Sequence, residues 1–132
     1  MPALFGVTLA LVVAIFARII GFDRDRAFYP VVLIVIASYY ALFAVMGGSR
    51  AELGAESIAF GLFATAAAVG FRTSLWIAVA ALAMHGVFDF FHPSLLAGRG
   101  GPLWWPTFCL SFDLAAAAGL AALLLAERRR AS

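Results

Sequence analysis

The sequence predicts an all-α membrane protein, a polytopic helical bundle of about five transmembrane helices in a single domain over residues 1–132. Hydrophobic residue types make up 65% of the chain and charged types only 12%, whereas soluble domains average about 45–50% and about 25%. Five apolar stretches approach the roughly 20 residues that cross the hydrocarbon core of a bilayer. The strands of a barrel would alternate polar and apolar residues, and the stretches lack that alternation.

Each expected span is bounded by residues that start or stop helices. Gly21 follows the first stretch, Pro30 stands in the first turn of the second, and Trp104-Trp105 opens the fifth. The link between the third and fourth stretches is so short that we expect these two helices to be antiparallel neighbours. The predicted spans cover residues 3–20, 28–46, 55–71, 75–92 and 104–126.

The arginines predict the orientation of the bundle. All nine basic residues are Arg, and the net charge of +2 is too small for a nucleic-acid-binding surface. On the predicted topology seven of them share the side of the C-terminus, and only Arg50 and Arg99 lie on the other side. Because cytoplasmic loops carry the excess of basic residues, we expect a cytoplasmic C-terminus and an N-terminus outside.

Ionisable residues gather at one level of the predicted bundle. His85, Asp89 and His92 follow each other at i, i+4 and i+7, so they share one stripe of the fourth helix. On the fifth helix Cys109 and Asp113 are also four residues apart. The fourth helix runs outward and the fifth inward, which brings these groups to similar depths in the outer half. Such residues are costly within a span, so they are candidates for a functional site.

A metal site is one interpretation of this pattern. Imidazole and carboxylate ligands suit a divalent transition metal such as zinc or iron, and Asp89-x-x-His92 has the spacing with which helical bundles offer two ligands to one ion. A di-iron bundle would repeat this pair on a second helix, and the chain does not. The candidate metal ligands are His85, Asp89, His92, Asp113, Glu56 and Cys109.

Two of these candidates also have simpler interpretations. Glu56 lies in the first turn of the predicted third helix, where the helix dipole favours an acid. Cys109 is the only cysteine, and a lone cysteine is more often a small buried residue than a metal ligand. The three tyrosines are interpreted as interface or packing aromatics.

The last three predicted helices resemble a family of small bacterial integral membrane proteins known only as a domain of unknown function. The resemblance lies in His85-x-x-x-Asp89-x-x-His92, the loop prolines and Cys109-x-x-x-Asp113. The chain departs from the family pattern at Trp104-Trp105. The resemblance implies a multi-pass protein of the bacterial inner membrane and a polar cluster whose members occur together, and it implies no reaction.

Three functions follow as hypotheses. The first is a metal site, in which a metal-bound water would be the nucleophile if the protein is an enzyme. The second is a proton or small-solute transporter or channel that uses the same acids and histidines. The third is a structural or assembly subunit of a membrane complex, in which these groups only fix helix packing. The lipid bilayer is the expected partner, and a homo-oligomer or a larger membrane complex is left open.

Overall fold

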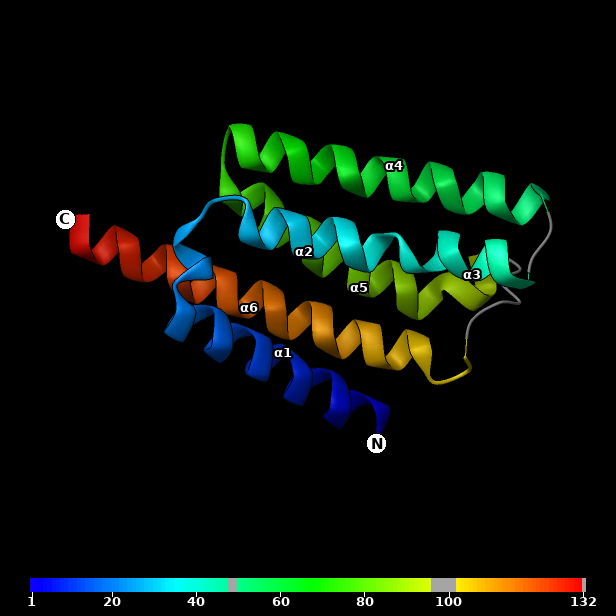
Figure 1. The fold of residues 1–132 in the computed structure, drawn as a ribbon, viewed down its shortest axis with the longest axis horizontal. Helices are drawn as coiled ribbons and strands as arrows, with labels where there is room; N and C mark the ends of the chain where they lie inside the picture. Colours follow the sequence, from blue (N-terminus) through cyan, green and yellow to red (C-terminus); the bar gives the residue numbers. More distant parts are fainter. Residues whose placement is uncertain (48–49, 96–101, 132) are drawn as a thin grey trace.

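The structure is a computed structural model that describes residues 1–47, 50–95 and 102–131. These residues form helices and turns without a strand, and five helices are long and apolar enough to cross a membrane, as the sequence predicts. The spans run antiparallel to their neighbours in the chain, so the N-terminus and the C-terminus lie at opposite ends of the bundle (Figure 1).

The first span is α1 (Pro2–Ile20), which is followed by the short 3₁₀-helix η1 (Phe22–Arg24). Gly21 ends α1 in the left-handed conformation with φ 94°, which glycine adopts without the steric cost that a Cβ would bring. Its N–H donates to the Ala17 carbonyl oxygen at 2.8 Å. The chain therefore turns sharply at this end of the bundle.

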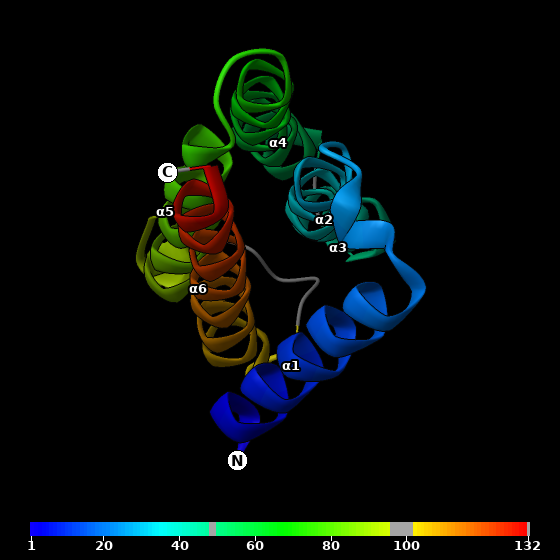
Figure 2. The same cartoon turned by 90° about the vertical axis from the view of Figure 1, so that its left-hand side faces the viewer.

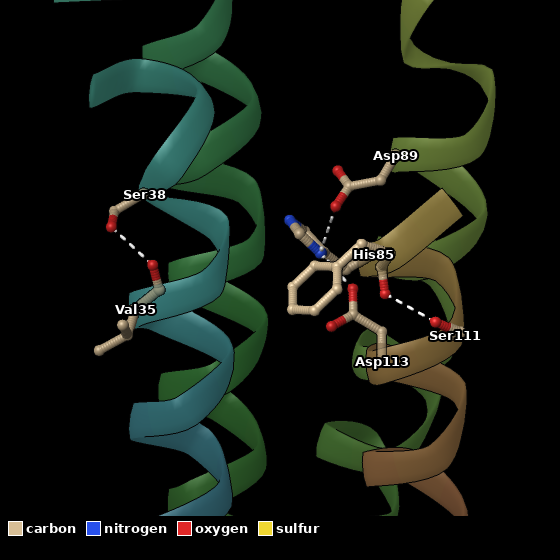
Figure 3. A network of polar contacts seen from close by, with 7 residues as sticks. Val35, Ser38, His85, Asp89, Ser111 and Asp113 are labelled. Carbon is tan, nitrogen blue, oxygen red and sulfur yellow. Dashed lines mark hydrogen bonds and ion pairs between the residues drawn. The ribbon is translucent and has the colours of Figure 1, made fainter. Parts of the chain in front are cut away.

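The second span is interrupted at Ser38, between α2 (Phe28–Ala37) and α3 (Tyr39–Gly47). The Ser38 hydroxyl donates to the Val35 carbonyl oxygen at 2.6 Å (Figure 3). A serine side chain that bonds to the preceding turn competes with the backbone ladder and bends helices. The two pieces still form one membrane-length span, Phe28–Gly47.

The last three spans are α4 (Arg50–Arg72), α5 (Leu75–Leu95) and α6 (Trp105–Ala131). Their number and order match the prediction, but α4 begins five residues before position 55 and α6 continues five residues beyond position 126. Hydropathy marks only the part of a helix that crosses hydrocarbon. The added ends carry charged residues, which are good helix formers, and arginines near the C-terminus of α6 suit the helix dipole.

The helices surround the axis of the bundle in an order that differs from the chain order (Figure 2). The most extensive contacts are those of α5 with α6 and of α1 with α6, while α4 packs against α2, α3 and α5. The consecutive spans α1 and α2 stand apart (Figure 2). Close contact between α1 and α6 depends on Gly6, because a Cβ there would overlap the Ser111 side chain and the Phe108 carbonyl oxygen.

The arginine-rich end of the bundle contains contacts between spans. The Arg26 side chain donates to the Phe71 carbonyl oxygen at 3.0 and 3.3 Å, which satisfies the C-terminal end of α4. Arg128 lies over the Trp76 ring, 5.5 Å from its centroid. The described arginines other than Arg50 belong to elements that meet at this end, in agreement with the predicted sidedness, and the compartment they face stays a prediction.

Between this end and the predicted polar level the core is apolar. Its largest fully buried side chains belong to three leucines that lie in one cluster and are at most 1% exposed. Small buried residues such as Ala67 and Ala78 complete it. We call the three leucines the leucine layer: Leu33 on α2, Leu82 on α5 and Leu120 on α6.

Candidate functional site

The stripe predicted on α5 faces the interior of the bundle. His85, Asp89 and His92 are 1%, 0% and 2% exposed, whereas the neighbouring Val87 and Phe90 are 44% and 49% exposed. The helix thus directs its ionisable residues inward and its apolar residues toward lipid, as expected for costly groups within a span. His85 is the central residue of α5, and Asp89 and His92 lie in the half farther from the arginine-rich end, as the predicted grouping by level requires.

Asp113 of α6 meets this stripe at His85. Its Oδ2 lies 2.6 Å from His85 Nδ1, and Oδ2 of Asp89 lies 3.5 Å from the same nitrogen. The three side chains point toward one another from two helices (Figure 3). We call His85, Asp89 and Asp113 the ligand trio, because one ligand atom from each lies within 4.8 Å of the others.

The trio is short of hydrogen-bond donors. Both carboxylate oxygens of Asp89 and Oδ1 of Asp113 are buried and receive no hydrogen bond from an N–H or O–H group within the described chain, and the donor that faces Asp89 is the weak S–H group of Cys109. Asp89 and Asp113 are both 0% exposed. Buried acceptors without donors cost free energy, and two ionised carboxylates beside one imidazole would carry an excess of negative charge. A cation at this point would remove both costs.

A glycine allows the two helices of the trio to come close. A Cβ at Gly86 would lie 3.0 Å from the Asp113 Cβ and 3.2 Å from the Leu110 carbonyl oxygen. A side chain at this position would therefore push α5 and α6 apart. Because Gly86 is next to His85 in the chain, the close approach lies where the imidazole must reach Asp113.

His92 forms a second pair, with Glu56 of α4. Its Nε2 lies 2.6 Å from Glu56 Oε1, and Glu56 is 3% exposed. Since α4 begins at Arg50, Glu56 is the seventh residue of the helix, and its placement in the first turn is wrong. An acid at this depth is beyond the N–H groups that a helix terminus leaves unpaired. We call these two residues and the ligand trio together the polar cluster.

Tyr40 belongs to the same region, although its sequence position predicted only a packing or interface role. Its ring stacks on His92, with centroids 3.7 Å apart and an interplanar angle of 12°. Its hydroxyl is buried without a hydrogen-bond partner among the described residues, and it interacts electrostatically with Asp89 and Glu56. A tyrosine in the middle of a span has a hydroxyl that needs a polar partner. This feature of the sequence could have identified Tyr40 as a neighbour of the polar cluster.

Cys109 is buried on α6, on the same face as Asp113, as predicted. Its thiol interacts with Asp89 and Asp113 but is not one of the three groups within 4.8 Å. The six predicted ligands are therefore distributed over three places. Three form the ligand trio, His92 and Glu56 form a pair, and Cys109 lies beside the trio.

Comparison of the chain with protein-family models, with curated proteins and with solved structures found no match. The family resemblance of the last three helices therefore stays a prediction. The geometry of the polar cluster is the basis for any functional assignment.

Proposed function

We propose that this chain is an integral membrane protein that binds a divalent transition metal ion through His85, Asp89 and Asp113. The observation that carries the proposal is the set of buried carboxylate oxygens that lack donors around the imidazole of the trio. One imidazole and two carboxylates suit zinc, iron or manganese. In a low-dielectric interior a divalent cation would balance the two negative charges, which otherwise are costly there.

Three protein ligands would leave a coordination position open. Catalytic zinc sites use three protein ligands and keep the fourth position for water or substrate, whereas structural sites are closed by four. A water bound there would be activated as a nucleophile. Cys109 and Tyr40, which both interact electrostatically with Asp89, belong to different helices and could position such a water or substrate.

The leucine layer favours metal binding over conduction. A proton path through the bundle would have to continue from the ligand trio to the arginine-rich end, past Leu33, Leu82 and Leu120. These side chains are at most 1% exposed, and the buried cluster around them is apolar apart from the tyrosine hydroxyl of Tyr29. A row of acids and histidines that stops at an apolar layer fits a site entered from one side.

On the predicted orientation this site lies in the outer half of a bacterial inner membrane, with the N-terminus outside. That orientation is supported by the arginines that gather at the other end of the bundle. The cluster would then be loaded from the periplasmic side. An enzymatic reaction and a larger assembly are separate hypotheses that metal binding neither requires nor excludes.

Elemental analysis of the detergent-purified protein tests the proposal. Protein expressed with supplied zinc, iron and manganese should contain about one metal ion per chain. Asp113→Asn should reduce the metal content at least about tenfold, because it removes a charged ligand. The matched control is Glu56→Gln, which changes another buried acid outside the trio and should leave the metal content unchanged.

Size-exclusion profiles and helix content by circular dichroism show whether each variant remains folded. Folded wild-type protein without metal would contradict the proposal. Equal metal loss in the two folded variants would contradict the assignment of the ligands to the trio.

A further inference from the structure

A second feature of the bundle is an apolar groove between α1 and α2, with α6 as its floor. Its volume is about 780 Å³, and its walls include Val13 of α1, Val32 of α2 and Phe112 of α6. It exists because α1 packs against α6 and stands apart from α2 (Figure 2). A groove of this size lies within the range of ligand sites in proteins.

The groove opens between two membrane spans, so the medium that reaches it is lipid. Along α2 and as far as the first residue of α3, its lining extends from Ala27 to Tyr39, a separation of twelve positions or about 18 Å of helix. One leaflet contributes about half of the roughly 30 Å hydrocarbon core. A single acyl chain from one leaflet therefore matches the length of the groove.

The α1–α2 turn at one end of the groove carries charges of both signs, with three arginines and two aspartates between positions 18 and 26. Gly21, Phe22 and Asp25 line it there, and the Arg24 side chain lies beside Gly21, 3.8 Å from the place of a Cβ. Arg18 pairs with Asp23, and Arg26 donates to the Phe71 carbonyl oxygen. The described residues place no ion-pair partner on Arg24, which leaves this guanidinium for an anion at headgroup level.

At its other end the groove reaches the neighbourhood of the polar cluster. Cys109 lines the groove and also interacts with Asp89. Trp105 lines the same end, and its indole N–H is buried without a hydrogen-bond partner in the described part of the chain. The groove thus extends from the turn that carries Arg24 to Cys109, which lies beside the ligand trio.

We propose that this groove binds one acyl chain of an anionic phospholipid, with the phosphate at Arg24 and the chain extending along α2 toward Cys109. The charge of Arg24 selects the anionic headgroup, and the length and apolar lining select the chain. The second acyl chain stays in the bilayer. This inference goes beyond metal binding and does not depend on it.

Photo-crosslinking in nanodiscs tests where the chain lies. The probe is phosphatidylglycerol with a diazirine near the end of one acyl chain, at a few per cent of the lipid. Peptide mapping should find the label enriched on groove residues such as Phe112 relative to Leu62, which is 69% exposed on α4. Equal labelling of the groove and of Leu62 would overturn the proposal.

A variant with a blocked groove and a matched control test where the acyl chain lies. Val35→Trp places a bulky side chain in the groove at a residue that is 47% exposed, so folding should be preserved, and Leu62→Trp is its control. We expect Val35→Trp to lose most of the labelling of Phe112 and Leu62→Trp to retain it. Equal labelling in both variants would contradict the placement of the chain.

The headgroup is tested by lipid binding in native mass spectrometry. Arg24→Gln should weaken binding of phosphatidylglycerol about fivefold, as expected for one basic residue at a membrane surface. Binding of phosphatidylcholine should not change. Arg72→Gln, at the same end of the bundle but outside the groove, is the control. An unchanged affinity in Arg24→Gln, or a lipid-free dimer in which a second copy fills the groove, would overturn the proposal.

Discussion

Both halves of α5 bury side chains in the bundle, but they are stabilised by different interactions. Toward the arginine-rich end, Leu82 packs in the leucine layer, and only Tyr29 in the buried cluster around this layer has a polar side-chain atom. Toward the other end, His85 and His92 each contact a carboxylate at 2.6 Å. Since lipid tails are as apolar as leucine, packing and polar contacts between helices drive association in membranes. The comparison indicates that the half with Leu82 mainly stabilises the bundle, whereas the half with His85 and His92 is suited to bind a ligand.

The largest effect on stability should follow from a change in the leucine layer. Leu82→Ala removes a fully buried side chain and leaves a cavity, so we expect a loss of about 2–5 kcal/mol in the free energy of unfolding. Metal content should not change. Steric trapping in bicelles measures the stability, and Met84→Ala, at a residue 64% exposed to lipid, is the control and should have a much smaller effect. Equal effects in the two variants would remove the distinction between the layer and the lipid-facing surface.

A change at Gly86 should affect both the stability of the bundle and metal binding. Gly86→Ala places a Cβ 3.0 Å from that of Asp113, so α5 and α6 must shift, at a cost of about 1–3 kcal/mol. The shift should also weaken metal binding about tenfold, because His85 and Asp113 separate.

Gly61→Ala is the matched control for this variant. Nothing lies within 4 Å of a Cβ at Gly61, so the change should stabilise the helix by about 0.5–1 kcal/mol. Titration of the metal-free protein with metal measures the affinity, and steric trapping measures the free energy of unfolding. Unchanged metal affinity in Gly86→Ala would show that the approach of the helices does not position the trio.

The smallest effect should come from the second histidine pair. Glu56→Gln keeps a side-chain oxygen for His92 but removes the charge, and we expect a loss of about 1 kcal/mol in the free energy of unfolding. Steric trapping measures it. A loss of more than about 3 kcal/mol would mean that the Glu56–His92 pair carries the stability of the polar half, contrary to the comparison.

Much of the fold follows from the sequence for a simple physical reason. A bilayer requires apolar helices of a fixed length, so hydropathy predicted five spans and their order. Helix periodicity placed His85 and Asp89 on one face, and the antiparallel order brought Asp113 to their level. The helix ends were predicted less well, because the charged first turn of α4 and the last turns of α6 continue beyond the hydrocarbon.

The arrangement around the site could not be predicted in the same way. The pairing of His92 with Glu56 depends on how α4 is rotated, and the stacking of Tyr40 depends on how α3 follows the interruption at Ser38. The groove exists because α1 packs on α6 and not on its neighbour in the chain. These are tertiary choices among helices that are all apolar, and helix periodicity does not distinguish them.

X-ray absorption spectroscopy of the zinc-loaded protein tests most directly whether the ligand trio is a metal site. The spectrum should show only nitrogen and oxygen ligands at about 2.0–2.2 Å, with the outer scattering of one imidazole. Asp113→Asn should lose the bound zinc, and Glu56→Gln should give the wild-type spectrum. A sulfur ligand at about 2.3 Å, the signature of Cys109 as a ligand, or scattering from two imidazoles would contradict the assignment to His85, Asp89 and Asp113.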